Sequence, residues 1–202
     1  FDRTAAGASG QCLQVVGGNT ATITDLVIDG FSAASVTLTD TGTALVYGNL
    51  TTLKLGYDEA LASTLTINPG TSGSAVLDLH GNNLNMADAS ALIAIAGTTS
   101  TVTIKNGHIT NLSGNKITVA TGNTLVLENV DITMSGNTTF GTTGHLTIKG
   151  HCKVYSDGNS GGGYTLTNSS VGTLTIAAEG WLTFENTVVY SHTGAATNIV
   201  FA

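Results

Sequence analysis

Ionisable side chains stand directly after the first strand of successive repeats in this chain. Matching the repeats places four of them in one column: His80, Lys105, Glu128 and Lys149. Strands that pair in a sheet lie about 4.8 Å apart, so neighbours in such a column can interact. A column of acids and bases could line a catalytic groove. Because Lys105, Glu128 and Lys149 alternate in sign, which keeps like charges apart, we predict a structural charge ladder instead.

A second set of reactive side chains occurs a few residues further along the repeats. His108 and Asp131 occupy matched positions, and Cys152 is the next member if no residue is inserted. Together they could form a nucleophile with its base, or a metal site. They could equally be unrelated corner residues, because a slip of one residue reverses the direction of a side chain. We predict no catalytic residue, no metal ligand and no cofactor.

The elements that position these side chains are short apolar strands in a repeat of a little over twenty residues. Such a period is typical of a solenoid. In the clearest repeat the strands lie at Val102–Ile104, Ile109–Leu112 and Ile117–Val119, separated by Gly and Asn at the corners. The first strands align through a series of apolar pairs, with Ile23 one step upstream: Leu45/Tyr47, Leu77/Leu79, Val102/Ile104, Leu125/Leu127, Leu146/Ile148 and Leu174/Ile176.

We therefore predict an all-β protein, a single right-handed parallel β-helix of about seven three-stranded rungs. Residues 1–20 form an N-terminal segment that leads into the first rung, and residues 21–202 form the β-helix. The rung length and the stacked apolar residues resemble the right-handed parallel β-helix superfamily. That superfamily includes bacterial surface adhesins, autotransporter passengers, phage tailspikes and pectin-degrading enzymes with the pectate-lyase-like fold.

The resemblance implies polysaccharide cleavage only if the catalytic residues of those enzymes are present. Their lyases use clustered Asp residues for calcium with an Arg or Lys base, and here the sole arginine, Arg3, lies outside the repeats. Gly107-His108 matches a Gly-His segment of the hydrolases, without the aspartates that accompany it there. The carboxylates that we compared do not align across rungs: Asp58, Glu59, Asp78, Asp88, Glu179 and Glu185. Since a two-carboxylate mechanism needs both groups at one site, we predict that the protein is not an enzyme.

Composition restricts the partners of the protein. The chain has 202 residues, a net charge of -7 and six Lys plus Arg, so we predict no nucleic-acid binding. No run of apolar residues is long enough for a membrane-spanning helix, and we predict no membrane insertion. A surface poor in charge and rich in Thr favours a secreted or cell-surface protein. Phe1 as the first residue fits a mature protein after signal removal, or only a chosen boundary of the chain.

Two surfaces could bind a ligand. The last third of the chain holds several aromatic residues that could form a glycan-binding patch, or could instead fill wide rungs near the end of the solenoid: Tyr155, Tyr164, Trp181, Phe184 and Tyr190. Outward Thr residues on the first strands resemble ice-binding faces. Val126 and His145 interrupt that Thr column, and Thr is also common on solvated strands.

The ends of a solenoid expose unpaired strand edges, which natural proteins normally cap. We identify no cap in this sequence, which predicts either assembly through the open edges or a chain from which the caps have been left out. Apolar or thiol-bearing residues lie near both ends, and we predict that they form self-assembly edges: Cys12, Leu13, Val15, Ile199, Val200 and Phe201. Two edges of one polarity make a head-to-tail contact that does not close. Cys12 and Cys152 could form a disulfide between copies across that junction, or remain free thiols.

We therefore predict a non-catalytic extracellular structural protein whose copies stack head to tail into a filament or surface fibre. The protein itself is then its main partner. A glycan-binding adhesin or passenger segment is the first alternative. A polysaccharide-degrading enzyme and an ice-binding protein are the others, and the sequence does not separate these alternatives decisively.

Overall fold

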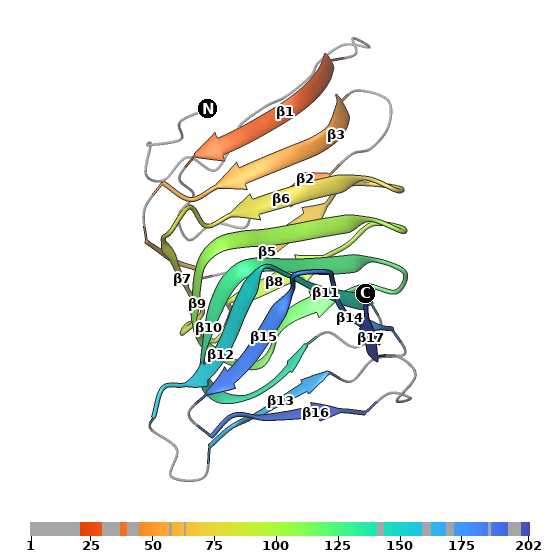
Figure 1. Ribbon diagram of the computed structural model, residues 1–202. Coiled ribbons are helices and arrows are strands. Elements are labelled where there is room, and N and C mark those ends of the chain that lie inside the picture. Colours follow the sequence, from red (N-terminus) through yellow and green to blue (C-terminus); the bar gives the residue numbers. More distant parts are fainter. Residues whose placement is uncertain are drawn as a thin grey trace.

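The computed structural model describes residues 21–29, 37–39, 45–56, 58–62, 64–140, 144–158, 163–168, 172–185, 187–193 and 199–202, with side chains from Thr52 onward. In these residues the regular structure is β-strand throughout, and no helix could cross a membrane. Parallel strands stack into a β-solenoid of about six turns (Figure 1). This confirms the predicted all-β solenoid with three strands per turn. Cys12, Leu13, Val15 and the rest of the predicted N-terminal segment lie outside the described residues.

Each turn of the solenoid has three sides, and each side is a parallel sheet. The first side is formed by β1 (Ala21–Asp29), β3 (Leu45–Lys54), β6 (Ser74–Asp78), the start of β9 (Thr101–Val119), the start of β10 (Thr124–Phe140), β11 (His145–Lys149), β14 (Leu174–Ile176) and β17 (Ile199–Phe201). In Figure 1 these strands descend from β1 at the top to β14 and β17 lower down.

The second and third sides follow the first around each turn. The second side consists of β4 (Glu59–Ala60), β7 (Asn83–Asn85), the middle of β9 and β10, β12 (His151–Ser156) and β15 (Trp181–Glu185). The third side consists of β2 (Thr37–Thr39), β5 (Thr64–Asn68), β8 (Leu92–Ile95), the ends of β9 and β10, β13 (Thr165–Asn168) and β16 (Val189–His192).

About six turns are present where about seven were predicted. The prediction counted a rung that begins at Ile23, and β1 occupies that position. Among the described residues, however, that turn has no strand on the second side.

Strands β9 and β10 each continue through the corners of the solenoid without interruption. The three strands predicted in the repeat from Thr101 all lie within β9. The chain bends where the backbone has positive φ, at Asn106 (58°), Asn111 (56°) and Gly114 (66°). Asn and Gly tolerate this left-handed conformation better than other residues. The bends at Asn106 and Gly114 fall between the predicted strands, whereas the bend at Asn111 falls inside the strand predicted at Ile109–Leu112, and none of the three ends β9.

The interior is a continuous stack of aliphatic side chains. On the first side Leu53, Leu77, Ile104, Leu127 and Ile148 lie in register and are each at most 1% exposed. Burial of such a side chain contributes about 1.5–3 kcal/mol relative to exposure. The regular period of two along each strand thus gives a core that runs along the axis.

The register of the first repeats differs from the prediction. Val102/Ile104 pair with Ala75/Leu77 and not with Leu77/Leu79, and Leu53 pairs with Leu77 in place of Leu45. Every second residue from Ala75 to Leu79 is apolar, so the pattern fits equally well after a shift of two residues. From Val102 to Ile176 the predicted pairs are confirmed.

Candidate functional site

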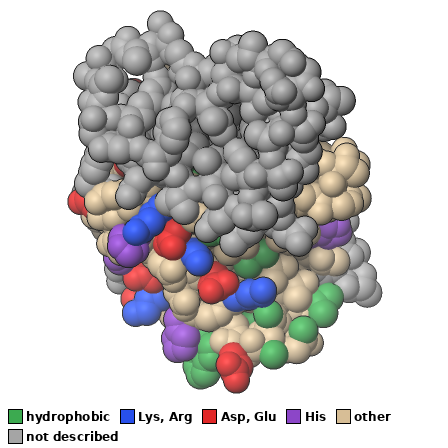
Figure 2. All heavy atoms as spheres, turned by 90° about the horizontal axis from the view of Figure 1, so that it is seen from above, with side chains coloured by type: hydrophobic (Ala, Val, Ile, Leu, Met, Phe, Trp, Pro, Cys, Tyr) green, Lys and Arg blue, Asp and Glu red, His purple; other side chains and the backbone are tan. Residues whose placement is uncertain are grey.

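The charge ladder lies on the outer face of the first side, and its members differ from the prediction at one position. Asp78, not His80, pairs with Lys105, and Lys105 pairs with Glu128, which pairs with Lys149. Lys105 Nζ lies 3.8 Å from Asp78 Oδ2. Lys54 extends the ladder upstream of Asp78. Figure 2 shows basic and acidic side chains alternating in a row along this face.

The error at His80 follows from the shift of two residues. His80 lies at the corner with φ of 51°, and its backbone N–H donates to Asp78 Oδ1 at 2.9 Å. Asp78 therefore caps the corner and carries the negative charge of the ladder. The side chains of this ladder are exposed or partly exposed, and exposed pairs contribute at most about 1 kcal/mol each.

A second polar column follows the outer face of the second side. His108 pairs with Asn83 and with Asp131, and Asp131 pairs with Lys153. His108 Nδ1 lies 3.8 Å from Asp131 Oδ2, and Lys153 Nζ lies 3.8 Å from Glu185 Oε1. Cys152 does not belong to this column, because the chain gains one residue at the preceding corner and Lys153 takes its place.

Cys152 instead points into the core. Its side chain is 1% exposed, and its Sγ lies 3.5 Å from the backbone oxygen of Leu127. Burial raises the pKa of the thiol, which is opposite to what a nucleophilic cysteine requires. A nucleophile with His108 and Asp131 is therefore excluded by geometry. A disulfide to another copy would require Cys152 to leave the core.

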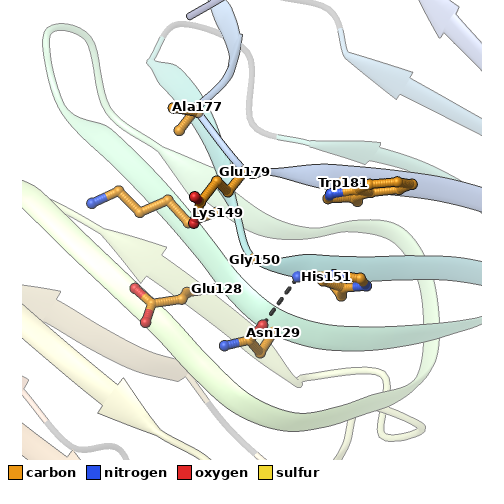
Figure 3. A pocket seen from close by; sticks show the side chains of 9 residues that line it. Glu128, Asn129, Lys149, Gly150, His151, Ala177, Glu179 and Trp181 are labelled. Atoms are coloured by element: carbon orange, nitrogen blue, oxygen red, sulfur yellow. Dashed lines mark hydrogen bonds between the residues drawn. The ribbon is translucent and has the colours of Figure 1, made fainter.

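A groove of about 530 Å³ lies at the corner between the first and second sides near the C-terminal end. Residues of three successive turns line it: Glu128, Asn129, Lys149, Gly150, His151, Ala177, Ala178, Glu179 and Trp181 (Figure 3). Glu128 and Asn129 belong to β10, Lys149 ends β11, His151 begins β12 and Trp181 begins β15. Most of these side chains are exposed, so the groove is open to solvent.

Backbone hydrogen bonds hold the floor of the groove. Asn129 has φ of 54°, and its Oδ1 accepts the backbone N–H of His151 at 3.0 Å. Gly150 has φ of 57°, and a Cβ there would lie 2.1 Å from Asn129 Oδ1. The backbone N–H of Trp181 donates to the Gly150 oxygen at 2.7 Å. The glycine is thus required both by its own conformation and by the close Asn129 amide.

Two aromatic rings stack along the axis at one side of the groove. The His151 and Trp181 rings have centroids 5.4 Å apart and planes inclined by 13°. They occupy paired positions of β12 and β15, and Figure 3 shows them one above the other, away from Glu128 and Lys149. Trp181 is 61% exposed. The ring therefore stacks on one neighbour while much of its surface remains available.

The predicted aromatic patch divides into two environments. Trp181 and the partly exposed Tyr155 lie on the outer face of the second side, at alternate positions of their strands. Tyr164 and Tyr190 pack against the core, and Tyr190 stacks on Phe184 with centroids 5.4 Å apart. Burial raises the pKa of Tyr190. Of the predicted patch, Trp181 alone lines the groove.

The predicted C-terminal edge residues form β17, which pairs with β14 through Leu174↔Ile199 and Ile176↔Phe201. Val200 is 39% and Phe201 is 80% exposed. Among the described residues, no strand pairs with the other edge of β17.

Some residues of the groove were not predicted from the sequence. Glu128, Lys149, Glu179 and Trp181 were considered for other reasons, whereas Asn129 and His151 were not. The signal that could have found them is the varying length of the corner, visible once the flanking strands are aligned. Within the described part of the chain, no group of three or more His, Cys, Asp or Glu residues is placed to hold a metal.

Comparison of the chain with protein-family models, with curated proteins and with solved structures finds no match. The fold and the site thus define a parallel β-solenoid with two outer polar columns and one open groove.

Proposed function

We propose that the protein is a non-catalytic extracellular structural solenoid whose copies join head to tail into a fibre. The observation that carries this proposal is the position of the exposed apolar side chains. Among the described residues, the large exposed hydrophobic side chains are Trp181, Val189, Val200 and Phe201. All four lie in β15, β16 and β17 at one end of the solenoid. Val200 and Phe201 are neighbours on the terminal strand β17, and exposed apolar side chains at a strand edge indicate an interaction site.

Phe201 is a core-type side chain that is left exposed at this end of the solenoid. It continues the inward stack of Ile148 and Ile176. Ile148 is 1% exposed, whereas Phe201 is 80% exposed. A further parallel strand placed on β17 would bury Phe201 as the interior turns bury Ile148. Strand addition of this kind supplies backbone hydrogen bonds and side-chain burial together.

The register of the solenoid identifies a matching strand in β1. Its residues Leu26, Val27 and Ile28 pair with Thr51, Thr52 and Leu53 of β3. Extending the same register past β17 would place Ile199, Val200 and Phe201 opposite Leu26, Val27 and Ile28 of a second copy. Three consecutive apolar residues of one copy would then pair with three consecutive apolar residues of the next. Because the described strands pair in parallel, the contact is heterologous and generates an open fibre.

Other features support the non-catalytic and extracellular parts of the proposal. The charges of the first side alternate as a structural ladder does, and Cys152 is buried. Charged residues make up 9% of the chain, which suits an exported protein. The resemblance to the right-handed parallel β-helix superfamily, with its surface adhesins and passengers, supports the same setting.

The test is to image the purified protein by negative-stain electron microscopy and to measure its mass by light scattering. The first side of one copy contains eight strands, so a fibre should repeat axially every 38 Å or so, at about 4.8 Å per strand. Val200→Asp should abolish the fibres, because it would put an unpaired carboxylate in place of an apolar side chain at the junction, opposite Val27. Thr147→Asp is the matched control, since Thr147 occupies the same outward column two strands further inside.

Wild-type protein that stays monomeric at high concentration would refute the proposal. Fibres of normal length from Val200→Asp would also refute it, because they would place the contact elsewhere. A folded Thr147→Asp protein that still forms fibres would show that an added charge alone does not prevent assembly.

A further inference from the structure

We propose that the groove at the first corner binds a neutral oligosaccharide, with Trp181 as the platform for a pyranose ring. This site does not depend on fibre formation. Its ligand class follows from three properties of the groove, namely the stacked aromatic ring, the mixed charges of the lining and the open shape.

Trp181 is an exposed ring that stacks on a neighbouring ring. Its backbone is tied to Gly150 by a hydrogen bond of 2.7 Å, and its ring stacks on His151. The ring is 61% exposed nevertheless. An indole has only two side-chain torsions, so it loses little conformational entropy when it binds a ligand, and it presents a broad apolar face. The carbon-bound hydrogens of a pyranose ring form a flat apolar face of matching shape.

The charged groups that line the groove on the side away from the ring favour a neutral ligand. Glu128 and Glu179 contribute two carboxylates, and Lys149 contributes one ammonium group. Carboxylates accept hydrogen bonds from sugar hydroxyls, and the ammonium group donates to them. An acidic sugar would meet an excess of negative charge, which opposes its binding. A sugar with hydroxyl groups alone can use both kinds of partner.

The groove arises because the corner lengthens from turn to turn. The offset between paired residues of β10 and the next turn is 21 before the corner (Glu128↔Lys149) and 22 after it (Asp131↔Lys153). In the following turn the offset rises from 28 (Ile148↔Ile176) to 30 (His151↔Trp181). The added residues carry Glu179 outward with φ of 61°.

Small side chains keep the groove open. The ladder position that follows Lys149 is Ala177, whose backbone N–H donates to the Ile148 oxygen at 3.0 Å. Ala177 therefore stands where the earlier turns have long charged residues, and the small Ala178 follows it. The volume of about 530 Å³ lies within the range of about 300–1,000 Å³ that is usual for ligand sites. Since the groove is open along the surface, an extended oligosaccharide fits it better than a compact molecule.

Trp181 is the one tryptophan of the chain, so its fluorescence reports directly on the groove. We would titrate cellopentaose, laminaripentaose and mannopentaose, with pentagalacturonate as the acidic comparison. The titrations use the Val200→Asp variant, so that association of copies does not alter the signal. At least one neutral probe should change the fluorescence saturably, and pentagalacturonate should bind at least tenfold more weakly.

Calorimetry on variants then locates the site. In the Val200→Asp background, Trp181→Ala should weaken binding at least tenfold and Glu179→Gln by a smaller factor. Phe201→Ala, which removes another exposed aromatic ring outside the groove, should leave binding unchanged. Circular dichroism checks that each variant is folded. The proposal is overturned if no neutral probe binds, if pentagalacturonate binds best, or if Trp181→Ala and Phe201→Ala weaken binding equally.

Discussion

Asn83 donates two hydrogen bonds to the carboxylate of Asp58. The backbone N–H lies 2.8 Å from Asp58 Oδ1, and the side-chain amide lies 3.0 Å from Asp58 Oδ2. The backbone bond is the main cause that lowers the pKa of Asp58 below its ordinary value of 3.8, and the side-chain bond adds to it. Asp58 lies 25 residues earlier in the chain, so this pair connects two successive turns.

Removing the Asn83 amide should therefore raise the pKa of Asp58 part of the way back to 3.8. In the wild type the lowered pKa contributes stability above pH 3.8 that is lost as the pH falls through the pKa of the folded protein. Asn83→Ala should thus be less stable than the wild type at neutral pH. The difference in stability between the two proteins should become smaller at low pH. A carboxyl carbon titration by NMR measures the pKa, and Asn82→Ala is a neighbouring control. An unchanged Asp58 pKa in Asn83→Ala would show that the side-chain bond is not formed in solution.

The sequence predicted the solenoid well because the core imposes a regular signal. Inward positions such as Ile104, Leu127 and Ile148 recur at a fixed place in each repeat, and polar corners mark the bends. The same regularity concealed the register at Leu77 and Leu79, where a shift of two residues leaves the pattern unchanged. The ladder was therefore assigned to His80 in place of Asp78.

The groove could not be predicted in the same way, since it depends on how corners of unequal length superpose. One added residue at Gly150 moved Cys152 from the polar column into the core and put Lys153 beside Asp131. A one-residue change of this kind reverses a side chain's direction. Neighbouring side chains such as His151 and Trp181 are 30 residues apart in sequence, and composition alone does not place them together.

Reversing one charge of the ladder should destabilise the protein in a salt-dependent way. Glu128→Lys would place three Lys residues in consecutive paired positions, at Lys105, 128 and Lys149. We expect a loss of about 1–2 kcal/mol at low salt, given about 0.2–1 kcal/mol for each cross-strand pair. The loss should shrink in 1 M NaCl, where the Debye length is about 3 Å. Urea unfolding at both salt concentrations measures it.

Glu128→Gln is the control for that reversal, because it removes the attraction without adding repulsion. It should lose less than about 1 kcal/mol. Equal losses in both variants, unaffected by salt, would show that packing of the Glu128 stem, and not its charge, is what stabilises this face.

The buried thiol should be chemically silent in the folded protein. In a Cys12→Ser variant Cys152 is the only thiol, and burial both shields it and raises its pKa. We expect almost no reaction with dithionitrobenzoate under native conditions and one equivalent after unfolding in guanidinium. Fast native labelling, or covalent multimers of wild-type protein on a non-reducing gel, would instead favour the disulfide between copies.

Gly150 offers a sharp test of the corner that supports the groove, because Gly158 provides a matched comparison. Both glycines have positive φ, of 57° and 81°. A Cβ at Gly158 would meet nothing within 4 Å, whereas one at Gly150 would lie 2.1 Å from Asn129 Oδ1. Gly158→Ala should lose about 1–2 kcal/mol, the penalty of the left-handed conformation for an L-residue. Gly150→Ala should lose at least 1 kcal/mol more, because Asn129 must move and release the His151 N–H. Thermal unfolding of both variants gives the difference between their losses of stability. Equal losses would mean that the Asn129 side chain does not occupy this corner in solution.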